Sequence, residues 1–218
     1  MKIALINGSP KVKYSASELI LNELKNFFNN SENEVNKKLS ICEYSFRSTK
    51  LDNNVVEEII NSNVLVFAFP LYVDGVPSHL LKCLVQLEEI FNNIKEKDIK
   101  VYALANCGFY EGEQNKLALE IFENWCIKCN LTWGQGAGIG AGPILHSVKN
   151  VPIGHGPKKN LGKALNIISD NIIKSSKDNN IFVKANFPRF AYKIAGEMGW
   201  KKAVKVNNLQ IKDLYKRL

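Results

Sequence analysis

Residues 3–17 of the chain, Ile-Ala-Leu-Ile-Asn-Gly-Ser-Pro-Lys-Val-Lys-Tyr-Ser-Ala-Ser, decide the fold. A short apolar run ends at Asn7, a polar loop follows, and a helical pattern begins at about Glu18. A strand that leads through a polar loop into a helix is a common phosphate site, because the helix start offers free N–H groups and the positive end of its dipole. The loop also contains hydroxyl donors, at Ser9, Ser15 and Ser17, and positive charge, at Lys11 and Lys13.

The loop does not match two familiar phosphate motifs. After Gly8 there is neither the second glycine nor the Lys-Ser pair of a P-loop, and the dinucleotide pattern G-x-G-x-x-G is absent. A hydroxyl-rich loop with one glycine suits a terminal phosphomonoester better than a pyrophosphate. The alternative is an N-capped helix whose serines only satisfy backbone amides.

Length and composition indicate a globular protein with a substantial core. The chain has 218 residues, of which 45% are hydrophobic and 23% charged. No apolar run approaches the roughly 20 residues needed to cross a bilayer. The N-terminus enters a strand with no signal-peptide pattern, so we expect a cytoplasmic protein.

Cysteine usage indicates neither a disulfide framework nor a metal site. The cysteines are five, an odd number, and only Cys126 and Cys129 form a C-x-x-C. That pair lies within a helical pattern rather than at a helix start, and we interpret both residues as structural. No second pair lies at zinc-ribbon spacing and the three histidines are scattered, so we expect no bound metal.

The sequence predicts a doubly wound α/β fold, because apolar runs alternate with helical patterns. Several runs are almost continuously apolar, as in strands buried on both faces of a parallel sheet. The predicted strands are residues 3–6, about 38–42, 64–69, 101–105 and about 131–139. The predicted helices lie near 17–29, 54–61, 78–92, 113–129 and 158–174. For five parallel strands with right-handed crossovers we expect the order 2-1-3-4-5.

A polar linker over residues 175–180 separates this domain, residues 1–175, from a basic extension over residues 181–218. The extension has nine basic and two acidic residues, a net charge of +7, whereas the first 180 residues are nearly neutral. We expect a helix that begins near Pro188 and carries several apolar side chains on one face, namely Phe187, Phe190, Ile194 and Met198, with Trp200 close by. We favour packing on the domain or across a dimer over contact with an anionic membrane or an acidic partner. Nucleic-acid binding is not expected, because no recognition motif accompanies the charge.

Two further loops distinguish the edge of the sheet where ligands of such folds bind. Residues 70–77 follow the third strand with two prolines, a glycine and Tyr72, and residues 106–113 follow the fourth with two glycines and two aromatics. A phosphate site beside glycines and aromatic side chains suits a ligand with one phosphate and one planar ring, and FMN has that shape. The alternative is that Tyr72, Phe109 and Tyr110 only anchor their loops.

The chain resembles the flavodoxin-like NAD(P)H-dependent FMN reductases over roughly residues 1–175. The matching segments are Asn7-Gly8-Ser9-Pro10-Lys11 with Ser15-Ala16-Ser17, Pro70-Leu71-Tyr72 with Pro77, and Asn106-Cys107-Gly108 with Tyr110-Glu111. The resemblance implies a flavodoxin-like three-layer sandwich that binds FMN. It also implies a homodimer in which the neighbouring subunit helps to close the flavin site.

The resemblance implies the following roles for these residues. The phosphate would be held by Ser9, Lys11, Ser15, Ala16 and Ser17. The ribityl chain and ring would be bordered by Pro70, Leu71, Tyr72 and Val73, and the polar edge of the ring would face Asn106, Cys107, Gly108 and Tyr110. Some relatives hold an iron–sulfur centre after the second loop, but Cys83 stands alone here, so we expect no cluster.

We therefore expect an oxidoreductase in which a hydride passes from NAD(P)H through FMN to a quinone, a nitro or azo compound, or free flavin. The chemistry belongs to the cofactor, so no catalytic side chain is assigned. The alternative is a flavodoxin-like electron carrier that does not oxidise nicotinamide. Such carriers commonly meet their partners through an acidic surface, which this chain lacks.

Overall fold

A computed structural model describes residues 1–30, 39–95 and 97–216 of the chain. These residues form two compact units, Met1–Ala185 and Asn186–Leu218. The strands are β1 (Lys2–Asn7), β2 (Ser40–Ser45), β3 (Val64–Pro70), β4 (Lys100–Asn106), β5 (Thr132–Ile139) and β6 (Ile181–Val183). The α-helices are α1 (Ala16–Asn30), α2 (Asn53–Ile60), α3 (Ser78–Asn92), α4 (Lys116–Lys128), α5 (Lys159–Ile173) and α6 (Arg189–Val206).

The first unit is built on a parallel sheet with the strand order β2-β1-β3-β4-β5-β6. The order 2-1-3-4-5 expected for the first five strands is confirmed, and the helices predicted near 17–29, 54–61, 78–92, 113–129 and 158–174 correspond to α1 to α5. The second strand is described from Ser40, and its expected start at Lys38 lies outside the described residues.

The expected count of five strands is wrong, because a sixth strand, β6, pairs with β5. It is only three residues long and lies in a segment that the sequence analysis assigned to the extension. Pairing with β5 holds this strand, together with a bond of 2.8 Å from the Gly140 amide to the Val183 carbonyl. Gly112 permits the close approach of the neighbouring loop, because a Cβ there would lie 2.6 Å from the Val183 carbonyl oxygen and 2.3 Å from that of Gly138. Three residues carry too short a pattern to identify a strand from sequence.

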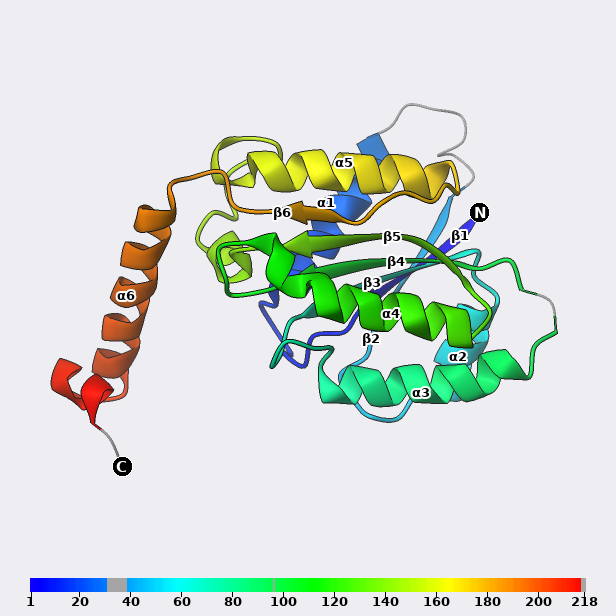
Figure 1. The fold of residues 1–218 in the computed structure, drawn as a ribbon, viewed down its shortest axis with the longest axis horizontal. Coiled ribbons are helices and arrows are strands. Elements are labelled where there is room, and N and C mark those ends of the chain that lie inside the picture. The colour runs from blue at the N-terminus through cyan, green and yellow to red at the C-terminus, as the bar shows by residue number, and fades with distance from the viewer. Residues whose placement is uncertain (31–38, 96, 217–218) are drawn as a thin grey trace. The chain divides into compact units, whose positions relative to one another are not determined.

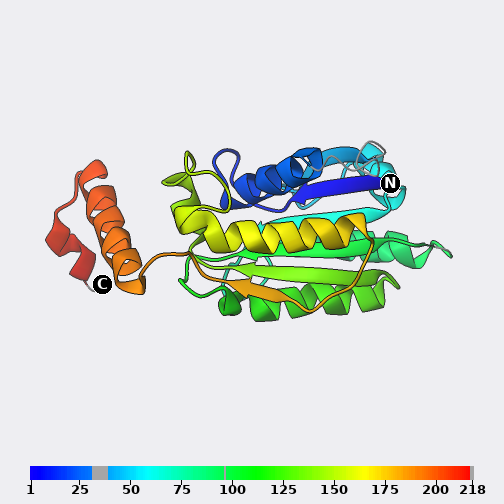
Figure 2. The same ribbon diagram turned by 90° about the horizontal axis from the view of Figure 1, so that it is seen from above.

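Alternate residues of the central strands enter two different cores. In β3, Leu65, Phe67 and Phe69 face one core, whereas Val64, Val66 and Ala68 face the other. Helices α3 and α4 cover the first face and α1 and α5 the second, so the fold has three layers (Figure 1). Viewed from above, α1 and α5 run side by side over the sheet (Figure 2). Burial on both faces explains why these strands are continuously apolar.

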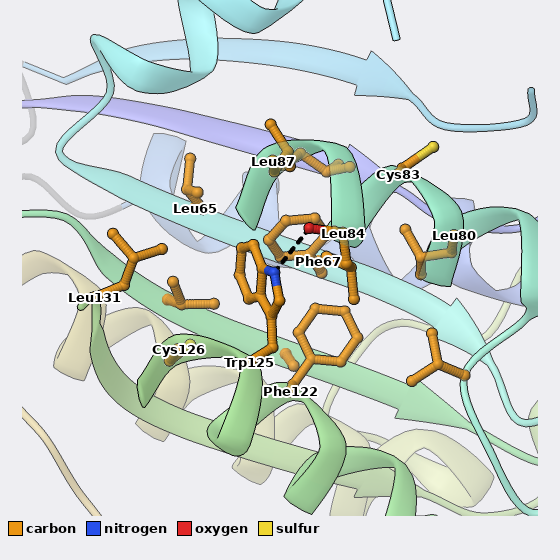
Figure 3. Packing of buried hydrophobic residues seen from close by; sticks show 14 of the residues in the cluster. Leu65, Phe67, Leu80, Cys83, Leu84, Leu87, Phe122, Trp125, Cys126 and Leu131 are labelled. Carbon is orange, nitrogen blue, oxygen red and sulfur yellow. Dashed lines mark hydrogen bonds between the residues drawn. The ribbon is translucent and has the colours of Figure 1, made fainter. Parts of the chain in front are cut away.

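Trp125 of α4 anchors the core between α3, α4 and β3 (Figure 3). Its indole N–H donates a hydrogen bond of 2.9 Å to the carbonyl oxygen of Leu84 in α3. Its ring meets Phe67 and Phe91 edge-on, at centroid distances of 5.9 and 6.2 Å. A buried indole needs an acceptor for its N–H, and this bond supplies one while it joins two neighbouring helices.

The second unit consists of α6 and a short 3₁₀ helix, η5 (Ile211–Tyr215). Pro188 is the residue before the first turn of α6, close to its expected position. Val204 is buried within this unit, and Asp213 accepts a bond of 2.8 Å from the Gln210 amide. The large apolar side chains of α6 at Phe190, Ile194, Met198 and Trp200 are all more than half exposed.

Among the described residues, the structure has no helix with the length and apolar character of a membrane-spanning segment.

Replacing Trp125 with Phe should lower the free energy of unfolding by about 2 kcal/mol, because the core loses a buried hydrogen bond and part of the ring volume. Urea denaturation followed by circular dichroism measures this change. Trp133→Phe is the matched control, since that indole donates a longer bond of 3.3 Å to Asn180 and is only half-buried. An equal loss in the two variants would contradict the role given to Trp125.

Candidate functional site

The loops after β1, β3 and β4 meet at the carboxyl edge of the sheet, beside the point where the strand order reverses. They border a cavity of about 190 Å³. Its lining comes from these three loops, the start of α1 and the loop after β5. The lining residues are Ser9, Lys11, Ala16, Ser17, Pro70, Leu71, Tyr72, Asn106, Cys107, Gly108, Pro143 and His146.

The loop after β1 is held by hydrogen bonds at both ends. The Asn7 side-chain oxygen accepts a bond of 3.0 Å from the Ser9 amide, and the Gly8 amide donates to the Ala68 carbonyl at 2.8 Å. At the far end, the Ser15 hydroxyl oxygen accepts from the Glu18 amide at 3.0 Å and so caps α1. The N-cap alternative from sequence is therefore correct for Ser15.

Close packing around Gly8 favours glycine at this position. A Cβ at this position would lie 2.5 Å from the Leu80 side chain of α3 and 3.2 Å from Cβ of Phe69. The Gly8 carbonyl also accepts a bond of 3.1 Å from Nε2 of His79, which lies in the first turn of α3. Helix α3 therefore positions the backbone of the loop after β1.

Ser9 and Ser17 accept hydrogen bonds as Ser15 does, but unlike Ser15 they line the cavity. Ser17 accepts a bond of 2.9 Å from the Asn106 amide group, and Ser9 accepts one of 3.3 Å from the Lys11 backbone. In the described part of the chain neither hydroxyl donates its own proton to a protein acceptor. Both residues line the cavity and are about 1% exposed. With Lys11 and the start of α1, they form a donor set suited to an anion.

The loop after β3 contains a tight two-residue turn. Tyr72 and Gly75 exchange two backbone hydrogen bonds of 3.1 Å, and the residues between them, Val73 and Asp74, have φ angles of +49° and +56°. Two successive positive φ angles define a type I′ turn. A β-branched residue rarely adopts this conformation, and Val73 is also fully exposed. Strain of this kind accumulates at functional sites.

In the loop after β4, Cys107 is buried and serves to hold the loop. Its thiol donates to the Glu111 carbonyl at 3.4 Å, and the Asn115 amide donates to its sulfur at 3.4 Å. Burial raises the pKa of the Cys107 thiol above its ordinary value of 9.0, an effect that the bonds from Phe109 and Asn115 reduce. The group is therefore a neutral thiol at neutral pH, not a nucleophilic thiolate.

The loop after β5 also reaches the cavity, which the sequence analysis did not anticipate. The Ala141 amide donates to the Phe109 carbonyl at 2.6 Å, and Gly142 donates to Cys107 at 2.8 Å. These bonds hold the 3₁₀ helix η3 (Gly142–His146) against the loop after β4, with its buried Leu145 in the core beside α1. His146 and Pro143 thus become lining residues.

Of the thirteen residues predicted from sequence, the cavity brings ten together. Ser15, Val73 and Tyr110 are not among its lining residues. Ser15 caps α1, Val73 lies at an exposed turn, and the Tyr110 hydroxyl donates a bond of 3.4 Å to the Ala185 carbonyl near β6. Asn106 lines the cavity, but its amide group already donates to Ser17 and to the Phe69 carbonyl, both at 2.9 Å.

The C-x-x-C pair lies away from this cavity, at the end of α4. Cys126 and Cys129 are buried free thiols. Burial raises the pKa of both, that of Cys129 to about 12, so neither is a ready nucleophile or ligand at neutral pH. No cluster of three or more His, Cys, Asp or Glu side chains suited to a metal ion occurs among the described residues.

A scan of the sequence against known protein families finds no match, and no curated protein matches it in sequence. Solved structures do share the fold. An NADH:FMN oxidoreductase in its apo form is 17% identical, with a TM-score of 0.57 over 81% of this chain and 90% of that chain. A short-chain flavodoxin associated with a bacterial microcompartment is 14% identical, with a TM-score of 0.54 over 81% of this chain and 100% of that chain.

An NADPH-quinone reductase from P. pentosaceus is 12% identical, with a TM-score of 0.54 over 79% of this chain and 98% of that chain. Identities this low establish the fold alone, and it is flavodoxin-like. Two of these three neighbours are reductases of the kind that the sequence resemblance indicates, and the third is a flavodoxin.

Replacing Val73 with Asn should raise the free energy of unfolding by about 1 kcal/mol, because Asn adopts a positive φ at lower cost than a β-branched residue. Thermal or urea denaturation measures the change. Asp74→Asn is the matched control, since it exchanges two residue types that both tolerate this conformation, and it should change stability little. A loss of stability in Val73→Asn would show that the valine side chain has a partner that offsets the strain.

Proposed function

We propose that this protein binds FMN in the cavity between the loops after β1, β3, β4 and β5. We further propose that it is an FMN-dependent oxidoreductase that takes a hydride from NAD(P)H and passes it to a quinone, a nitro or azo compound, or free flavin. The observation that carries the proposal is the pair of buried Ser9 and Ser17 hydroxyls beside Lys11 at the start of α1. When bound, FMN would supply the hydride chemistry, and the protein would supply position and polarity.

The chemistry of the donor set fits the phosphate of FMN. Ser9, Ser17 and Lys11 would hold it, and no carboxylate is among the described residues that line the cavity. The cavity, at about 190 Å³, is smaller than typical cofactor sites of roughly 300–1,000 Å³. It therefore suits the phosphate end of the molecule, and the ring would lie toward Tyr72, a lining residue that is 43% exposed.

Asn106 has a role in the proposal beyond the one implied by the family resemblance. Its amide protons are engaged with Ser17 and Phe69, so only its side-chain oxygen is left for the polar edge of a flavin. We propose that it also positions the Ser17 hydroxyl. Because the Ser17 oxygen accepts from Asn106, its proton is left to donate to the bound anion.

We also propose a homodimer in which a second copy covers the mouth of the cavity. The support is a set of exposed apolar side chains on three loops of the same sheet edge: Val12, Tyr14, Tyr72, Val73 and Phe109. Exposed apolar side chains gathered at a site mark an interaction surface. Five free cysteines accord with a reducing compartment, so we place the protein in the cytoplasm.

The competing function is that of an electron carrier that does not oxidise nicotinamide. Residues 1–185 include 21 basic and 19 acidic residues, so the unit is nearly neutral. Carriers of this class commonly have an excess of acidic residues on the surface that meets their partners. To decide, the purified protein is loaded with FMN, and each nicotinamide is added without oxygen while flavin absorbance is followed. Quinone and nitroaromatic acceptors are then screened. Bound flavin that neither nicotinamide reduces would favour the carrier, and failure to bind FMN would reject both functions.

Replacing Lys11 with Gln should weaken FMN binding by about tenfold, because a charge-assisted bond to the phosphate is lost. Quenching of flavin fluorescence measures the dissociation constant. Lys13→Gln is the control, because Lys13 lies two residues further along the same loop but does not line the cavity. Riboflavin, which has no phosphate, should bind the wild type and Lys11→Gln equally. If both lysine variants weakened FMN binding equally, general charge attraction would explain the effect.

A further inference from the structure

The chain has three histidines, and His146 differs from the other two in its hydrogen bonding. His79 donates from Nε2 to the Gly8 carbonyl at 3.1 Å, and His155 donates from Nδ1 to the Ile153 carbonyl at 3.2 Å. His146 is half-buried, yet its ring has no hydrogen-bond partner among the described residues. A polar ring that is partly withdrawn from water without a protein partner is suited to meet a ligand.

The position of His146 is fixed by the fold. It ends the 3₁₀ helix η3, and the amides of Ala141, just before this helix, and of Gly142, its first residue, are bonded to the loop after β4. The preceding residue, Leu145, is 7% exposed and packs in the core beside α1. His146 itself lines the cavity with Ser9, Lys11 and Ser17. The imidazole therefore shares the cavity with the phosphate donors but comes from a different loop.

Burial and the neighbouring charges determine the protonation state of the His146 ring before a ligand binds. Burial and the positive charge of Lys11 lower its pKa below the ordinary 6.5, with burial the larger cause, and Glu18 in the first turn of α1 opposes them. The ring is thus neutral at pH 7. A phosphate dianion beside it would reverse the balance, because an opposite charge at short range favours the protonated ring.

We propose that His146 is a proton-dependent ligand of the flavin phosphate, so that the protein takes up a proton on the His146 ring when it binds FMN. This inference rests on the proposed function, since it assigns a regulator to the same site. No bond other than that of the proton to the imidazole nitrogen is made or broken, and the proton comes from solvent. The consequence is that pH sets how much of the protein holds its cofactor.

The direction of the pH dependence follows from linkage. Binding raises the pKa of the ring, so the additional affinity is fully present below the pKa of the free protein. It is lost as the pH rises through the pKa of the complex. FMN should therefore bind more tightly at pH 6.5 than at pH 8.5. The second ionisation of a phosphomonoester lies near pH 6, so the phosphate is mostly a dianion across this range and adds little dependence of its own.

The test measures dissociation constants of FMN and riboflavin from pH 6.5 to 8.5 by fluorescence quenching. For the wild type we expect the FMN constant to rise about fivefold over this range, and the riboflavin constant to change little. His146→Gln should bind FMN with little pH dependence and at the weaker level. His146→Lys, with a fixed charge, should bind tightly at both pH values. His155→Gln, outside the cavity, should behave as wild type.

Titration calorimetry at pH 7.5 in two buffers of different ionisation enthalpy counts the protons directly. We expect a net uptake of protons on FMN binding in the wild type and its loss in His146→Gln, a readout that a purely structural role would not move. Unchanged pH dependence in His146→Gln, or equal pH dependence for FMN and riboflavin, would overturn the inference while leaving the proposed function intact. A wild-type protein that binds neither flavin would overturn both.

Discussion

The carboxyl edge of the sheet depends on the amide group of Asn106. It donates to the Ser17 hydroxyl at the start of α1 and to the Phe69 carbonyl at the end of β3. Three segments that are distant in sequence therefore meet on one buried side chain, which is 4% exposed. Buried polar groups without partners cost about 1–3 kcal/mol each, so these bonds are mutually required. Because the Ser17 oxygen accepts the bond from Asn106, its own proton can be donated to a group in the cavity.

The sheet was largely predictable because burial on both faces leaves a strong signal. Residues 64–69 and 101–105 are apolar at nearly every position, and the structure sends alternate residues of both strands into two cores. The sixth strand was not predictable for the opposite reason. Residues 181–183 are half-exposed and too few to show a period, and they are held by pairing with β5 rather than marked by a pattern of their own.

The site was predictable where a loop directly follows a central strand. The rule that ligands bind beyond the carboxyl ends of β1, β3 and β4 selected most of the cavity lining. It missed His146, because that residue lies seven positions after β5 and reaches the cavity only through tertiary hydrogen bonds. Ala141, at a φ of +56°, begins this return, and an alanine gives no sequence signal of a left-handed conformation.

Buried polar groups and an exposed aromatic side chain line the same cavity at the carboxyl edge of the sheet. Its inner end is polar and rigid, since Ser9 and Ser17 are buried and each is fixed by a hydrogen bond. Tyr72, which also lines the cavity, is 43% exposed. Under the proposed function, the buried serines would select a phosphate, and changing them would disturb the hydrogen bonds that hold the loops. The exposed Tyr72 side chain would face the molecule that meets the ring, and changing it would disturb the fold less. The phosphate would therefore be selected by buried groups and the acceptor by exposed ones.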